Sequence, residues 1–168
     1  LSAAQAPLAS LFVNDSVWMK EAMAPLVRID GKDYIPCEIC SYFDYIKLTN
    51  NGSDNVLIEN TVNGSYVSFI VSEKKAAVNG EVYDVDGFVQ NGVPYIEADF
   101  LAENLGIMTE SFNYDGNQIL RLFDSGANLS LDEIIKANEY KPENPDDEAG
   151  GELEGGFKKI YIFTKYDS

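Results

Sequence analysis

Short stretches in which apolar and polar residues alternate run along most of the chain, and turn residues separate them. The dipeptides Asp30-Gly31 and Asn91-Gly92 each stand between two such stretches. Glycine allows the positive φ of a tight hairpin, and Asp or Asn before it tolerates the same region. Alternation with a period of two indicates half-buried strands. The pattern therefore predicts a β-hairpin at each dipeptide.

A helical pattern follows each predicted hairpin. In residues 97–106, Phe100, Leu101 and Leu105 share one face at helical spacing, and Gly106 is a natural stop. Pro36 suits the first turn of an earlier helix. The apolar positions of that earlier helix are Cys37, Ile39, Cys40 and Phe43.

Two segments of the chain repeat the same order of turns and apolar residues. Equal spacing separates three pairs of positions: Gly31 and Gly92, Tyr34 and Tyr95, Ile35 and Ile96. A second hairpin follows each helix, over residues 46–58 and 108–123, and residues 66–71 alternate as one more strand. Because such repetition decides the fold class, we predict an α+β fold. It consists of two diverged repeats of hairpin–helix–hairpin, about residues 11–60 and 76–124, with antiparallel sheets packed on short helices.

The repeated pattern of turns and apolar residues ends at residue 124, so we predict that residues 1–124 form the repeat domain. Residues 125–140 form a short helical extension with Ser130 as N-cap and Glu133 as its capping-box partner. Residues 141–156 are an acidic Pro/Gly-rich linker. Residues 157–168 form a C-terminal strand, ordered from Phe157 to Tyr166, because their apolar residues alternate with high β propensity.

The composition limits the partners. The chain has 28 acidic and 12 basic residues, a formal net charge of −16. This charge repels phosphate backbones and anionic lipid surfaces. No apolar run reaches the roughly eighteen residues of a membrane helix. We therefore expect neither nucleic acid binding nor membrane insertion. A start without Met fits a mature chain trimmed after a signal peptide, or a late start, and both remain open.

The chain contains no histidine. This removes the usual general base, the Ser–His and Cys–His nucleophile systems and the commonest nitrogen metal ligand. We predict no catalytic residues, no cofactor and no tight transition-metal site. Catalysis by carboxylates, Lys, Tyr or Cys stays conceivable. A carboxylate-based hydrolase would need two carboxyl groups roughly 5 to 9.5 Å apart in a cleft.

Three groups of residues invite a functional interpretation. Cys37 and Cys40 have the spacing of a thiol–disulfide pair, but core packing or a structural bridge is favoured over redox chemistry. Residues 84–87 and 113–117 carry oxygen ligands, yet turn chemistry explains both, since neither has the spacing of an EF-hand loop. Trp18 and the tyrosines could stack on a carbohydrate, although core or cross-strand packing is favoured.

The order of turn, Tyr-Ile-Pro, helix, Leu-Gly and Asp-Gly turn resembles the copper amine oxidase N-terminal-like, or stalk, domain of secreted bacterial proteins. Glu97 stands where that family usually has Pro, and the first copy lacks Leu-Gly after its helix. The resemblance implies an antiparallel sheet curled around a helix on a surface-exposed protein with no established activity. The residues that carry it, within about residues 11–124, are Asp30-Gly31, Tyr34-Ile35-Pro36, Asn91-Gly92, Tyr95-Ile96, Leu105-Gly106 and Asn113-Tyr114-Asp115-Gly116.

Together these observations predict a non-catalytic binding or spacer module, secreted or at the cell surface of a bacterium. Its partner would be a protein or polysaccharide of that surface. Strand-mediated self-association through Phe157 to Tyr166 is a further expectation. The alternatives are a carbohydrate-binding module with exposed aromatic residues and the carboxylate-based hydrolase.

Overall fold

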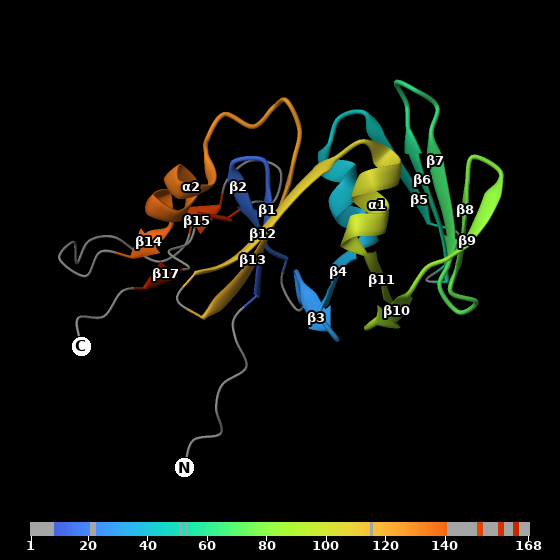
Figure 1. The fold of residues 1–168 in the computed structure, drawn as a ribbon, viewed down its shortest axis with the longest axis horizontal. Coiled ribbons are helices and arrows are strands. Elements are labelled where there is room, and N and C mark those ends of the chain that lie inside the picture. Colours follow the sequence, from blue (N-terminus) through green and yellow to red (C-terminus); the bar gives the residue numbers. More distant parts are fainter. Residues whose placement is uncertain are drawn as a thin grey trace, which may run out of the picture. The chain divides into compact units, whose positions relative to one another are not determined.

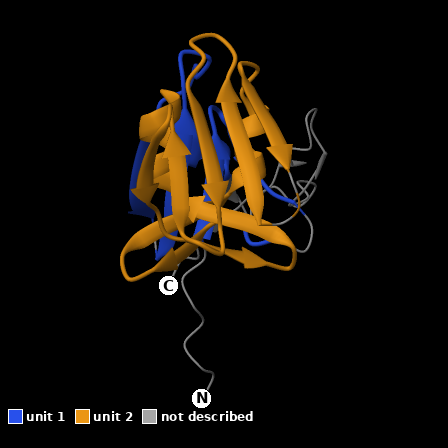
Figure 2. Ribbon diagram, turned by 90° about the vertical axis from the view of Figure 1, so that its right-hand side faces the viewer, with its two compact units in different colours: residues 1–25, 109–168 blue, residues 26–108 orange. Residues whose placement is uncertain are grey.

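A computed structural model describes residues 9–20, 23–50, 52, 54–114, 116–140, 151–152, 158–159 and 163–164 (Figure 1). Mixed α and β structure with mostly strands confirms the predicted α+β class. The chain separates into two compact units (Figure 2). Unit 2 is Leu26–Met108, and unit 1 combines Leu1–Pro25 with Thr109–Ser168. The residues that we assigned to one repeat domain thus contribute to both units.

The sheet of unit 1 has the order β12 (Met108–Tyr114), β13 (Asn117–Phe123), β1 (Ala9–Val13) and β2 (Ser16–Trp18). β1 is antiparallel to β2 but parallel to β13. The prediction of wholly antiparallel sheets is therefore wrong at this pairing. The physical reason is burial: β1 ends in three buried residues and β13 contains four in a row, which is typical of interior strands that pair in parallel.

Helix α2 (Leu131–Ala137) covers part of unit 1 and confirms the predicted capped helix. The Ser130 side chain accepts a hydrogen bond from the Glu133 backbone N–H, and the Glu133 side chain accepts one from the Ser130 backbone. This capping box satisfies two backbone donors that a helix start leaves without partners. Ile134 and Ile135 of α2 pack into one apolar cluster with residues of β1, β2 and β13.

Arg121 on β13 is the polar centre of unit 1, with only 3% of its side chain exposed. Its guanidinium donates to the carbonyls of Asn14 (2.8 Å) and Leu129 (2.7 Å) and to carboxylate oxygens of Asp15 (3.2 Å) and Glu110 (3.4 Å). Because a buried charge needs partners on every side, Arg121 ties the turn after β1 to the loop before α2.

Four two-residue strands complete the described part of unit 1. β14 (Glu139–Tyr140) pairs in parallel with β17 (Phe163–Thr164), and β15 (Gly151–Glu152) pairs antiparallel with β16 (Lys158–Lys159). The other residues from Phe157 to Tyr166, and the predicted linker up to residue 150, lie outside the described residues. A continuous C-terminal strand therefore stays a prediction.

Unit 2 contains two antiparallel sheets. The larger is the five-stranded meander of β5 (Ile46–Asn50), β6 (Asn55–Asn60), β7 (Tyr66–Ile70), β8 (Lys75–Val78) and β9 (Glu81–Asp84). The smaller has the order β10 (Gly87–Gln90), β11 (Val93–Glu97), β4 (Lys32–Pro36) and β3 (Val27–Ile29). Each neighbouring pair of strands in both sheets is antiparallel.

Helix α1 (Ala98–Leu105) packs its buried face, with Leu101 and Leu105, against β7, β11 and β4. It ends at Gly106, whose φ of 75° confirms the predicted C-terminal stop. The earlier helix, η1 (Cys37–Tyr42), is a 3-10 helix. It follows Pro36 directly and links β4 to β5, and 3-10 turns are frequent as connectors between elements.

Both predicted Gly turns are tight hairpins with positive φ at two successive residues. Asp30 and Gly31 have φ of 51° and 79°, and Asn91 and Gly92 have 52° and 76°. The order hairpin, helix, hairpin occurs from β3 to β6 and again from β10 to β13. The second hairpins lie in different units, however, because β5 and β6 belong to unit 2 and β12 and β13 to the sheet of unit 1. Descent from one repeated unit remains a hypothesis.

Candidate functional site

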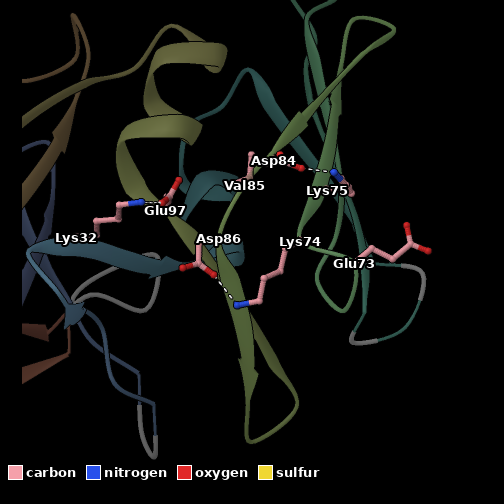
Figure 3. A pocket seen from close by; sticks show the side chains of 8 residues that line it. All are labelled: Lys32, Glu73, Lys74, Lys75, Asp84, Val85, Asp86 and Glu97. Carbon is pink, nitrogen blue, oxygen red and sulfur yellow. Dashed lines mark hydrogen bonds and ion pairs between the residues drawn. The ribbon is translucent and has the colours of Figure 1, made fainter.

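A pocket of about 480 Å³ lies on unit 2, where β4, β8, β9 and the end of β11 bring charged side chains together (Figure 3). All but one of its lining residues are charged. They are Lys32, Glu73, Lys74, Lys75, Asp84, Val85, Asp86 and Glu97. Three lysines face four carboxylates in a chain that has only 12 basic residues. The pocket is therefore a place where scarce positive charge gathers.

Lys74 holds an unusual backbone conformation at the centre of this pocket. It ends the turn before β8 with φ of 52°. Among the residues that the structure describes, every other non-glycine residue with positive φ is Asn or Asp. The left-handed region is unfavourable for a residue with a Cβ atom, by roughly 1 to 2 kcal/mol, and Asn and Asp tolerate it best. The surrounding backbone fixes this conformation: the Lys74 N–H donates to Val71 (3.1 Å) and its carbonyl accepts from Val85 (3.0 Å).

Asp86 is the acceptor on which several groups of the pocket converge. One carboxylate oxygen accepts from Lys74 Nζ (2.6 Å) and from the Gly87 N–H (3.0 Å). The other accepts from the Tyr34 hydroxyl (3.0 Å). The hydrogen bonds from Lys74 and then Tyr34 lower the pKa of Asp86. Asp86 is therefore a firmly ionised carboxylate at neutral pH.

Tyr34 on β4 donates its hydroxyl hydrogen bond to Asp86 and is itself almost fully buried. Burial, followed by the hydrogen bond to Asp86, raises the pKa of Tyr34 to about 12. The phenol thus stays neutral and keeps its proton for Asp86 over the physiological range. Its ring also packs at 5.4 Å from the ring of Phe88. Packing and hydrogen bonding together fix the position of the Asp86 carboxylate.

Each of the other two lysines of the pocket has its own carboxylate. Lys32 Nζ lies 2.8 Å from Glu97 Oε1, and Lys75 forms an ion pair with Asp84. The hydrogen bond and charge of Glu97 raise the pKa of Lys32. The side chains of Lys32 and Lys75 are 62% and 49% exposed. Such solvated pairs contribute little to stability, so these groups can exchange partners with a charged ligand at low cost.

A smaller pocket of about 170 Å³ adjoins the first, because Lys32 and Glu97 line both pockets. Asp33 and Asp99 complete the lining of the smaller pocket. Burial raises the pKa of Asp33, and the nearby charge of Asp99 adds to this, while Arg28 opposes it. Arg28 Nε lies 3.5 Å from Asp33 Oδ1 without forming a hydrogen bond. Within the described part of the chain, no cluster of His, Cys, Asp or Glu has the arrangement of a metal site.

The thiol pair lies elsewhere, in the core of unit 2. Cys37 and Cys40 on η1 are free cysteines with exposed fractions of 0% and 1%. Burial raises the pKa of Cys40 to about 12 and that of Cys37 well above its ordinary value. Because the thiolate is the reactive form, this environment disfavours redox chemistry at the pair.

Among the residues whose side chains the structure describes, Trp18 and the tyrosines do not form an exposed row. Trp18 is fully buried, and Tyr34 and Tyr95 are nearly so. Of the large aromatic side chains that the structure describes, Tyr83 is exposed, at 43%. It packs edge-on against Phe100, with ring centroids 6.2 Å apart. Trp18 therefore offers no stacking surface.

The structure brings together some residues that the sequence pointed out for other reasons. Asp84 and Asp86 were interpreted as turn residues, and both line the pocket. Glu97 was only a departure from a family pattern, and it holds Lys32. Lys74 was missed, although adjacent lysines in an acidic chain are a signal that could have found it. The other oxygen-rich turn includes Asp115, which lies outside the described residues.

Comparison with protein-family models, curated proteins and solved structures finds no match for this chain. No described helix has the length and apolar character to cross a membrane.

Proposed function

We propose that this protein is a non-catalytic binding module of a bacterial cell surface or secreted protein, and that the charged pocket of unit 2 is its ligand site. The observation that carries the proposal is the backbone of Lys74, which is held in the left-handed region with its side chain directed at Asp86. Residues held in such strained conformations cluster at ligand-binding and active sites. Asn or Gly would suit this turn better, so the presence of lysine at this position points to a use for its charge.

The electrostatics of the pocket support binding rather than proton transfer. A general acid or base works best with a pKa near neutrality, whereas the pKa of Asp86 is lowered and that of Tyr34 is raised to about 12. Both groups keep one protonation state across the physiological range. Fixed charges with well-defined positions are suited to recognise a charged partner.

The chemistry of the lining favours a protein partner over a polysaccharide. The lining combines seven charged residues with one valine and includes no aromatic ring. Sugar rings stack on exposed aromatic faces, whereas protein surfaces offer ammonium, guanidinium and carboxylate groups that can pair with those of the pocket. The proposed partner is therefore a protein of the cell surface. The family resemblance and the predicted repeat are consistent with this role and belong to the same proposal.

Binding of labelled protein to intact bacterial cells, before and after protease treatment of the cells, tests the proposal. Lys74→Glu places a negative charge beside Asp86 and should reduce binding at least about tenfold, roughly 1.4 kcal/mol. The matched control is Lys47→Glu, an exposed lysine on β5 at the other edge of the same sheet. Equal binding by the two variants, or binding that survives protease treatment, would contradict the proposed site or the protein partner respectively.

A further inference from the structure

β9 is the last strand of the five-stranded sheet, and no strand that the structure describes pairs with its outer edge. All four of its residues are exposed, including Val82 at 68% and Tyr83 at 43%. Sheet edges are usually protected because an edge is a template for another strand. Apolar side chains on an open edge are consistent with a surface that another strand covers.

The hairpin register shows which backbone groups of β9 face outward. Val78 and Glu81 flank the two-residue turn, so they form the hydrogen-bonded pair, and hydrogen-bonded and non-hydrogen-bonded pairs alternate from there. Glu81 and Tyr83 therefore direct their backbone groups toward β8. The Val85 N–H continues this alternation by donating to the Lys74 carbonyl (3.0 Å). The N–H and C=O groups of Val82 and Asp84 consequently point to the open edge.

The side chains of β9 define what kind of strand fits there. Their order is acidic, apolar, apolar, acidic, from Glu81 to Asp84. Directly opposite residues on paired strands contact each other, and opposite charges attract while like charges repel. A complementary strand therefore has basic residues three positions apart with two apolar residues between them. This order complements β9 in either strand direction.

We propose that β9 accepts such a basic–apolar–apolar–basic segment of a partner protein by strand addition. The proposal deepens the proposed function and rests on it, because Asp84 belongs both to β9 and to the charged pocket. A strand added at this edge places its residue opposite Asp84 at the pocket. The backbone bonds supply affinity, and the pocket and the two acidic residues supply selectivity.

A second copy of this chain fits the edge poorly. If two β9 strands paired antiparallel over their full length, Glu81 of each copy would face Asp84 of the other. Both contacts join like charges, and each chain already has a net charge of −16. The charge pattern therefore favours a basic partner segment over self-pairing at β9.

The test uses the full ¹⁵N-labelled chain and a capped synthetic hexapeptide, Thr-Lys-Val-Ile-Lys-Thr. Its matched control, Thr-Val-Lys-Lys-Ile-Thr, has the same composition but places lysines opposite Val82 and Tyr83. Titration followed by NMR should shift the amides of Val82 and Asp84, and the first peptide should bind about tenfold more tightly than the control. Equal affinities would overturn the proposal, since they would indicate general charge attraction.

Two protein variants locate the binding site independently. Val82→Pro removes an outward-facing N–H, which edge strands tolerate, and should weaken binding of the first peptide about tenfold. The control is Val89→Pro, since Val89 is an exposed valine whose N–H also faces outward, on the edge strand β10. Equal loss in both variants, no binding of the first peptide, or β9 shifts that depend on protein concentration alone would each overturn the proposal.

Failure of strand addition at β9 can be distinguished from failure of the charged pocket as a binding site. If Lys74→Glu abolishes cell binding while Val82→Pro leaves it intact, the pocket binds its partner and strand addition is wrong. If neither variant affects cell binding, the proposed function itself is wrong.

Discussion

Replacement of Lys74 should separate the strain of its backbone from the ion pair of its side chain. In Lys74→Asn the left-handed conformation becomes favourable, which recovers about 1 kcal/mol of the strain. The lost ion pair with Asp86 contributes little, about 0 to 1 kcal/mol, because the two side chains are 61% and 44% exposed. The two effects nearly cancel, so the free energy of unfolding of Lys74→Asn should be about equal to that of the wild type.

Lys74→Ala provides the contrast, because alanine loses the ion pair but keeps the strain. It should be less stable than Lys74→Asn by about 1 kcal/mol. The only tryptophan, Trp18, belongs to unit 1, so its fluorescence does not report on unit 2. Native-state hydrogen exchange of amides in β6 and β7 measures the free energy of unfolding of unit 2 directly. Equal stability of the Asn and Ala variants would refute the strain argument, and with it the main support for the pocket as a functional site.

Three further changes test other parts of the structure. Gly87→Ala should destabilise unit 2 by about 2 kcal/mol or more, because a Cβ there would lie 2.5 Å from Phe69 Cζ. Hydrogen exchange measures the free energy of unfolding of unit 2, and a value equal to that of the wild type would contradict the close packing at Gly87. Arg121→Met should destabilise unit 1 by about 3 kcal/mol, because it leaves the Asp15 carboxylate without its buried cation. Urea unfolding followed by Trp18 fluorescence measures this loss of stability, and a loss below about 1 kcal/mol would contradict a structural role for the contacts of Arg121. The folded pKa of Tyr34 is raised from 10.0 to about 12, so its contribution to stability is complete below pH 10 and is lost as the pH rises through 12. Tyr34→Phe should therefore lose less stability at alkaline pH than the wild type, and its absorbance titration should lack one late-ionising phenol. Wild-type behaviour in both measurements would contradict the raised pKa.

Local features of the fold could be predicted because neighbouring residues determine them. The backbone at Asp30-Gly31 and Asn91-Gly92 follows from the conformational freedom of these residues, and the start of α2 follows from the reciprocal bonds of Ser130 and Glu133. The end of α1 at Gly106 has the same local origin. Such signals need no knowledge of the rest of the chain.

The remaining features depend on residues that lie far apart in the sequence. The parallel pairing of β1 with β13 joins residue 11 to residue 120, and no local pattern predicts such a partner. The pocket likewise joins Lys32 to Glu97, 65 positions away. The conformation of Lys74 was not predictable either, because lysine has no preference for positive φ and the hydrogen bond from Val85 imposes it.

Hydrogen–deuterium exchange of the full chain on intact bacterial cells tests the central claim most directly. If the charged pocket of unit 2 is the ligand site, amides of residues 72–75 and 82–87 should exchange more slowly on cells than in solution. Those of β5, at the other edge of the same sheet, should be unchanged. Tight binding to cells without slower exchange at residues 72–75 and 82–87 would contradict the account.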